Sequence, residues 1–293
     1  MKIAALLGGA MLAFAAAAAG QMNFSDDPEA GTLTLRDGRT PVLVYRYGDQ
    51  VKDGLDPKFI RSSYIHPLHG LDGRVLTEDF PADHPHHRGL FWAWPVVKTR
   101  GVVTSNWEAR SPPLRQIFTR WTLRAASLGS AELGVENAWV LDGRETVARE
   151  YVLLRTSLAE SGERRLTVEI VLEAVGGPLE LQGAPDQGKG YGGLCFRGAS
   201  FFKGAAIRAE KEILEADVVN TPLRWAGLAA KEAELLIEVL PEHPGGPQIP
   251  WLIRTSYGGV LNPSWPGLSP IVLEPGEPVR LAYLVRVRGG IPK

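Results

Sequence analysis

The chain has 293 residues, a net charge of −1 from 32 basic and 33 acidic side chains, and 44% hydrophobic residues. No basic stripe accompanies this balance, so nucleic acid is not an expected partner. The single cysteine, Cys195, excludes an internal disulfide, and stability must therefore come from a hydrophobic core.

The first predicted element is an apolar run, rich in Ala and Leu, that follows Lys2 and extends to Ala19. A positive charge, an apolar stretch and a small-residue end are typical of a secretory signal peptide. The alternative is an uncleaved anchor, but the run is at the lower limit of the roughly 20 residues that span a bilayer. We predict a signal peptide over 1–19, a periplasmic or secreted protein, and no stable membrane insertion after cleavage.

The remaining chain, 20–293, is predicted to form a single domain in which β-type alternation dominates. Asp37-Gly38 and Asp142-Gly143 lie between β-prone runs, and such pairs are strong hairpin signals. One short helical pattern, at 229–234, also fits the approach to a strand. Many strands separated by Gly and Pro turns predict an all-β fold, a large antiparallel β-sandwich. The expected strands are 32–35, 42–45, 121–126, 131–141, 145–155, 164–173, 194–197, 206–207, 235–240, 251–255, 271–273 and 279–288.

Five of the six histidines fall within 22 positions, at His66, His69, His84, His86 and His87. Imidazole exchanges protons near neutral pH and also binds metals. Three interpretations stay open: acid/base or substrate-binding groups, metal ligands, and structural histidines bonded to the backbone. The spacing lacks a zinc or non-haem iron signature. No cofactor is therefore predicted, and a metal at the histidine cluster stays an alternative.

Three aromatic residues, Phe91, Trp92 and Trp94, follow the histidines directly. On a strand, Trp92 and Trp94 point the same way. Aromatic faces beside polar groups suit sugars, whose C–H faces stack while their hydroxyls form hydrogen bonds. For each Trp taken alone, a place in the sandwich core is an equally good interpretation.

Two further stretches carry polar residues among β structure and turns. The glycine-rich stretch 186–197 lacks the Gly-Lys-Ser/Thr ending of a phosphate-binding loop, so its side chains better fit the wall of a pocket. In the stretch 243–263, a structural role is the default for each polar residue. The candidates in these two stretches are Lys189, Tyr191, Arg197, His243, Arg254, Tyr257 and Asn262.

Motifs in all three stretches resemble a bacterial family identified as the PmoA family, also labelled methane oxygenase. The resemblance implies a β-sandwich similar to the galactose-mutarotase-like supersandwich and a sugar-related function. It does not support membrane-bound methane oxidation, because the chain has no set of spanning helices. The chain departs from the family pattern at 243–248, where many members carry an Asn and this chain has Gln248. The matching pieces are Tyr64-Ile-His-Pro, Asp83-His-Pro-His-His-Arg-Gly, Lys189-Gly-Tyr-Gly-Gly-Leu, Trp225-Ala-Gly, His243-Pro, and Trp251-Leu-Ile-Arg-Thr-Ser-Tyr-Gly with Asn262-Pro.

The leading hypothesis is an exported carbohydrate-active protein whose histidines perform acid/base chemistry on a small-molecule or oligosaccharide substrate, by epimerisation, elimination or hydrolysis. His86 and His87 are the expected acid/base groups, with Asp83 as the orienting carboxylate and His66 as a further catalytic side chain. The alternatives are a non-catalytic carbohydrate-binding module and a metal-dependent oxygenase, as the family label implies. The expected substrate-binding residues are His84, Arg88, Trp92, Tyr191, Arg197, His243, Arg254, Tyr257 and Asn262.

Overall fold

The structure, a computed structural model, describes residues 20–210, 212–214 and 216–290, so the predicted signal peptide lies outside the described residues. The described chain is built from antiparallel strands and three short 3-10 turns, η1 (Pro57–Phe59), η2 (Asp186–Gly188) and η3 (Ser200–Phe202). The predicted all-β antiparallel fold is thereby confirmed. No helix among these residues has the length and apolar character that crossing a membrane requires.

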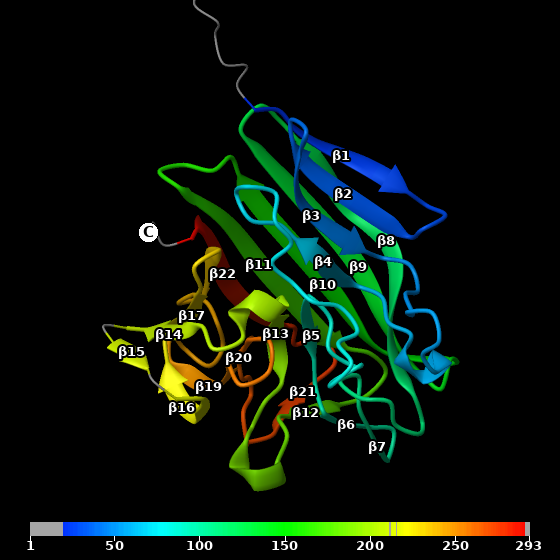
Figure 1. Cartoon of the computed structure of the whole chain (residues 1–293). Coiled ribbons are helices and arrows are strands. Elements are labelled where there is room, and N and C mark those ends of the chain that lie inside the picture. Colours follow the sequence, from blue (N-terminus) through cyan, green and yellow to red (C-terminus); the bar gives the residue numbers. More distant parts are fainter. Residues whose placement is uncertain (1–19, 211, 215, 291–293) are drawn as a thin grey trace, which may run out of the picture.

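Two nine-stranded sheets and one four-stranded sheet make up the fold (Figure 1). The first sheet runs β1 (Met22–Asp27), β2 (Thr32–Asp37), β3 (Thr40–Arg46), β4 (Tyr64–Leu68), β5 (Leu90–Ala93), β13 (Gly193–Arg197), β20 (Val260–Pro263), β19 (Ile249–Arg254), β16 (Val218–Leu223). The second runs β15 (Glu212–Leu214), β14 (Ala206–Ala209), β17 (Trp225–Ala229), β18 (Ala233–Val239), β22 (Val279–Gly289), β11 (Glu163–Ala174), β10 (Glu145–Ser157), β9 (Ser130–Leu141), β8 (Leu114–Ala126). The third runs β21 (Ile271–Leu273), β12 (Leu179–Gln182), β6 (Val96–Thr99), β7 (Val102–Thr104).

Both predicted hairpins are present, and their turns explain the residues found there. Asp142 and Gly143 join β9 to β10 with φ angles of 51° and 67°. A two-residue hairpin turn of this kind requires positive φ at both central positions, which Asp tolerates and Gly adopts freely. Gly38, with φ of 57°, has the same role between β2 and β3.

The main core lies between the two large sheets, where one apolar cluster draws on both (Figure 1). Strand β5 contributes to two clusters, because successive side chains point to opposite faces of a sheet. Leu90 and Trp92 belong to the inter-sheet core, whereas Phe91 and Ala93 belong to a second, smaller cluster. The first sheet therefore has apolar packing on its outer face as well, and this outer face supports the candidate site.

Of the two interpretations of 229–234, the approach to a strand is the one found. Strand β17 ends at Ala229, and β18 begins at Ala233, so these residues form a hairpin connection. The backbone N–H of Ala230 donates to the carbonyl oxygen of Ala233 at 3.0 Å and closes this turn. Several short strands, including β4 to β7, were not predicted, because each has too few residues to show a clear alternation.

Candidate active site

The histidine-rich loop between β4 and β5 is tightly folded rather than extended. The backbone N–H of His84 donates to the Pro81 carbonyl at 3.1 Å, and that of His87 donates to the His84 carbonyl at 2.8 Å. These two consecutive turns bring three imidazoles together. Gly89 ends the loop where the chain passes against β4, and a Cβ there would lie 2.3 Å from the Ile65 carbonyl oxygen. Only glycine fits so close an approach.

Aromatic rings stack in a column through the loop. The His84 ring lies between His87, at 4.8 Å and 11°, and Tyr257, at 4.7 Å and 19°. His86 stands edge-on to His87 at 4.7 Å. On its far side, His87 contacts Trp107 edge-on, with ring centroids 5.8 Å apart. Residues separated by more than 170 positions therefore meet in one column, which fixes the imidazole orientations by packing.

A buried guanidinium holds the carboxylates behind the column. Arg197, only 3% exposed, donates from Nη2 to Asp83 Oδ1 at 2.9 Å and to Glu78 Oε2 at 3.0 Å. Asp83 Oδ2 in turn lies 3.1 Å from His84 Nδ1. Burial alone would raise the pKa of Asp83, but its contacts with His84 and Arg197 outweigh this and lower the pKa. Asp83 is thus an ionised orienting group, and its direct partner is His84 rather than His86 or His87.

Burial keeps the other two imidazoles of the loop neutral. Desolvation by burial lowers the pKa of His86 to about 4, and the charged guanidinium groups of Arg88 and Arg61 contribute to this shift. Stronger burial, together with the positive charges of Arg197 and Arg88, lowers the pKa of His87 well below 6.5. His87 Nδ1 is buried without a hydrogen-bond partner among the described residues. At neutral pH both rings carry a free nitrogen lone pair, which is what a general base requires.

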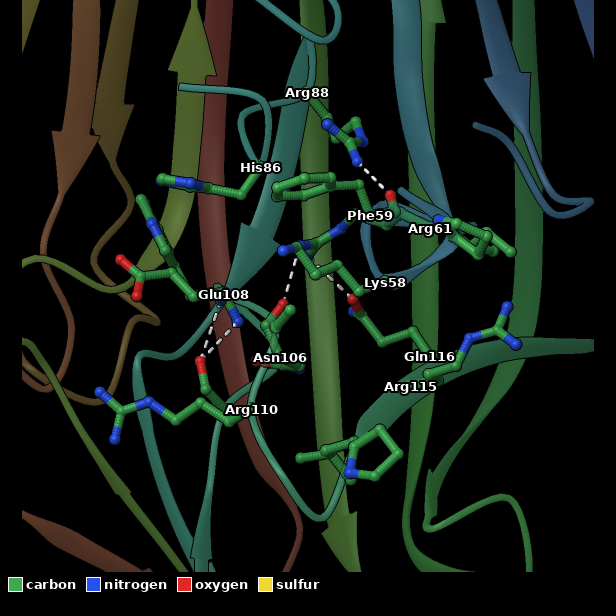
Figure 2. A pocket seen from close by; sticks show the side chains of 17 residues that line it. Lys58, Phe59, Arg61, His86, Arg88, Asn106, Glu108, Arg110, Arg115 and Gln116 are labelled. Atoms are coloured by element: carbon green, nitrogen blue, oxygen red, sulfur yellow. Dashed lines mark hydrogen bonds between the residues drawn. The ribbon is translucent and has the colours of Figure 1, made fainter. Parts of the chain in front are cut away.

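Two adjoining cavities border the loop, and both are lined by His86, Trp107 and Glu108. The cavity of about 160 Å³, here called the histidine cavity, lies at the mouth of the ring column. The second, of about 220 Å³, is called the arginine cavity and is shown in Figure 2. Further residues lining the histidine cavity are His84, His87, Lys189, Tyr191, Leu252, Arg254, Tyr257, Val260 and Asn262.

The structure thus brings together most of the residues predicted from three separate stretches. His84, His86 and His87 meet Tyr191, Arg254 and Tyr257 at the histidine cavity. Burial raises the pKa of Tyr191 to about 12 and also raises that of Tyr257. Both phenols therefore keep their protons at neutral pH. Arg254 also pairs with Asp217 at 3.4 Å.

Trp92 and Arg88, both predicted to bind substrate, do not line the histidine cavity. Trp92 is 0% exposed in the inter-sheet core, since its place on β5 points it away from the site. Arg88 is also buried, and its guanidinium donates to the carbonyl oxygens of Pro85 at 2.6 Å and Phe59 at 2.5 Å. It holds the histidine loop in shape from below, while lining only the arginine cavity.

Two predicted histidines lie outside both cavities, which corrects their assignment to the site. His66 lies on β4, and its Nδ1 is 2.9 Å from the Thr77 hydroxyl. His243 is buried, with Nε2 3.0 Å from the Tyr283 hydroxyl. Asn262 does line the histidine cavity, but its Nδ2 donates to Leu194 O at 2.6 Å and its Oδ1 accepts from the backbone and a hydroxyl. Its amide anchors the glycine-rich loop.

Three residues of the site were missed by sequence reasoning, namely Arg61, Trp107 and Glu108. The Trp107 ring packs at a tilt of 49° against Tyr191, with ring centroids 5.0 Å apart, and Trp107 lines both cavities. A tryptophan between polar neighbours, in Ser105-Asn-Trp-Glu, was the available signal, since a loop tryptophan needs a packing partner. Arg61 carries no comparable local pattern.

The histidine cluster was also considered as a metal site. Among residues 20–210, 212–214 and 216–290, no three His, Cys, Asp or Glu side chains are grouped as metal ligands would be. The cluster instead shows one carboxylate contact, between Asp83 and His84.

Fold and site together define an all-β sandwich protein with a cavity of histidines and tyrosines on the outer face of one sheet. The chain belongs to DUF6807, a family of unknown function, which matches residues 32–293. This match corrects the resemblance to the PmoA family that the motifs indicated, and the oxygenase alternative loses the label on which it rested. No curated protein matches the chain.

Several solved structures are similar in architecture. One is a heparan sulfate lyase HepC mutant from Pedobacter heparinus, at 9% identity and a TM-score of 0.43, covering 90% of this chain and 36% of that one. A second is the putative mutarotase YeaD from Salmonella typhimurium, at 14% identity and 0.42, covering 92% and 88%. A third is a GalM/aldose epimerase homologue from C. elegans, at 7% identity and 0.35, covering 92% and 100%. The chain spans about a third of the lyase chain's length.

Proposed function

We propose that this chain is an exported carbohydrate-active enzyme that transfers a proton at a sugar ring bound in the histidine cavity. The observation that carries the proposal is the meeting of neutral imidazoles and protonated phenols at one cavity. A base that lacks a proton and an acid that keeps one are the two groups such a reaction needs.

His86 is the base in this proposal. It is half-buried, it lines both cavities, and its pKa of about 4 leaves it unprotonated at neutral pH. His87 lies deeper, at 5% exposure, and supports His86 through an edge-on contact. His84 is held by Asp83 and stacked on Tyr257, so it fixes the cavity wall.

Tyr191 and Tyr257 are the proposed proton donors. Both line the histidine cavity, and Tyr191 also packs on Trp107. Glu108 is the one carboxylate that lines this cavity among the described residues. Glycoside hydrolysis ordinarily uses two carboxylates across the bond. Epimerisation or elimination, which need one base and one acid, therefore fit the cavity better than hydrolysis.

The test compares His86→Ala with His69→Ala, incubated with a panel of mono- and oligosaccharides and followed by proton NMR. His69 is a matched control, because it lies in the same stretch but bonds to the Gly73 carbonyl at 2.9 Å, outside the cavity. Turnover should be lost in His86→Ala and kept in His69→Ala. Equal turnover in both variants would sink the assignment, and sugar binding without any product would indicate a binding module.

A further inference from the structure

The arginine cavity, beside the proposed catalytic histidines, has a lining of unusual charge. Five cationic side chains line it, and Glu108 is the one acidic side chain that does so among the described residues. Figure 2 shows Arg61 in the middle of this cavity, with His86 on one side and Arg110 at another edge. The cationic residues are Lys58, Arg61, Arg88, Arg110 and Arg115.

Arg61 is held in place by neutral oxygens alone. It is 9% exposed, and it donates to the carbonyl oxygens of Asn106 and Trp92, each at 2.8 Å, and to Gln116 Oε1 at 3.0 Å. Gln116 is itself fixed by donating to the buried carboxylate of Glu150 at 2.8 Å. The guanidinium is thus pre-organised by residues from distant strands, while its charge meets no carboxylate directly.

The other cations differ in how far they are neutralised. Lys58 lies 3.3 Å from Asp56, Arg115 pairs with Asp49, and Arg88 Nε lies 3.8 Å from Asp79. None of these three carboxylates lines the cavity. Among the described residues, neither Arg61 nor Arg110 is within ion-pair distance of a carboxylate.

Near this cavity, buried hydrogen-bond donors outnumber the acceptors available to them. Arg61 Nε and Asn106 Nδ2 are buried and have no partner among the described residues. Asn106 Oδ1 accepts from the Trp94 backbone at 2.7 Å, which leaves its Nδ2 as the free end. A buried cation without a carboxylate as counter-charge is costly, and so are unpaired donors. An anion bound in this cavity would lower the cost of the buried Arg61 charge.

We infer that the substrate is an acidic saccharide whose carboxylate occupies the arginine cavity while its reacting ring lies at His86. This inference rests on the proposed function of the histidine cavity. The shared walls make the placement possible, since His86, Trp107 and Glu108 line both cavities. A uronate is favoured over a sulfated sugar, because a carboxylate on the carbon that loses its proton can accept the C–H electron pair, whereas a sulfate ester cannot.

A carboxylate in this position also explains how a neutral imidazole could remove a carbon-bound proton. His86 would take the proton from the carbon next to the carboxylate, and the C–H electron pair would move into the carboxylate as an enediolate. The cationic wall would stabilise that added negative charge. A phenol proton would then return to the carbon from the other face, or protonate the oxygen that leaves from the neighbouring carbon.

The experiment measures binding by calorimetry for trisaccharides of galacturonate, mannuronate, guluronate and glucuronate, for their methyl esters, and for neutral and sulfated counterparts. The variant carries Lys58→Gln and Arg110→Gln, both at exposed positions, and Lys203→Gln is the matched control outside the cavity. Methyl esterification removes the negative charge and little else. We expect uronate affinity to fall about tenfold in the double variant and at least as much on esterification, as for lost charged hydrogen bonds.

A second variant, Arg61→Gln, is tested for uronate binding by the same calorimetry, and thermal unfolding verifies that it folds. It should weaken uronate binding by more than tenfold, while Arg61→Lys should recover part of the affinity. If a neutral saccharide is turned over in a way that depends on His86, and its affinity is unchanged by Lys58→Gln/Arg110→Gln, this inference is overturned and the proposed function stands. Binding of sulfated sugars alone would overturn the carboxylate assignment. Binding of no saccharide would overturn both proposals.

Discussion

Acidification should destabilise the protein through His243, a buried histidine outside the site. It is 3% exposed, its Nδ1 accepts from the Gly245 backbone at 3.2 Å, and its Nε2 lies 3.0 Å from the Tyr283 hydroxyl. The backbone contact assigns the neutral tautomer with the proton on Nε2. Protonation would place two N–H groups opposite each other, in a site with no compensating carboxylate.

The direction and the size of the change in the free energy of unfolding follow from the linkage between folding and proton binding. Burial lowers the pKa of His243 from 6.5 to about 4 in the folded state. The unfolded chain therefore binds the proton first, and stability is lost as the pH falls from 6.5 toward 4. At 1.36 kcal/mol per pH unit, the loss from this residue is about 0.8 kcal/mol at pH 6 and about 2 kcal/mol at pH 5.

The assay is urea unfolding, followed by tryptophan fluorescence, of the wild type and His243→Gln between pH 7.5 and pH 5. Because His66 and His86 also have lowered pKa values, the wild type should show a steeper loss than one residue provides. The variant should start less stable and lose less on acidification, so the two curves converge. Parallel curves over this range would refute the reasoning, because His243 would then titrate alike in both states.

Three further substitutions test the supports of the site. Asn262→Ala should cost about 3 kcal/mol of stability by urea unfolding, because it leaves the buried N–H and carbonyl groups of Gly192 without their hydrogen-bond partner. A loss below about 1 kcal/mol would contradict this. Gly89→Ala should cost about 2 kcal/mol or more, because the new Cβ meets a fixed carbonyl oxygen; a wild-type melting temperature would count against it. Glu150→Gln should cost about 2 kcal/mol and broaden the orientations of Arg61, as seen in a crystal structure, because a carboxylate that accepts three N–H groups becomes partly a donor.

The sequence predicts the long strands and their turns well. Strand β11 shows why, because Leu166, Val168, Ile170 and Leu172 recur at every second position, mostly between polar residues, and all four are buried. A long run repeats the pattern often enough to exceed chance. Strand β5 has four residues, all buried, because both faces of the sheet are covered there. With no alternation to read, the sequence could not tell Trp92 from Phe91.

The sequence predicted which residues belong to the candidate site better than it predicted which of them contact one another. Histidine clustering pointed to His86 and His87, and the motifs added Tyr191 and Tyr257. Partner choice depends on register and loop shape, so sequence proximity could not show that Asp83 contacts His84. Arg61 depends on Gln116 and Glu150, which are 55 and 89 positions away, and no local pattern marks such a network. The location in the periplasm or outside the cell stays a prediction.

The alternation along β5 has a consequence for how this fold could change its substrate. The first sheet acts as a partition, with the packing that holds the sandwich on one side and the cavity floor on the other. Val260 lines the histidine cavity, and Ala93 and Cys195 belong to the same outward cluster. Val260 forms part of the floor, and Ala93 and Cys195 are fully buried in the cluster that supports it. Exchanges among them would reshape the cavity without disturbing Trp92, so new specificities could arise while the scaffold stays unchanged.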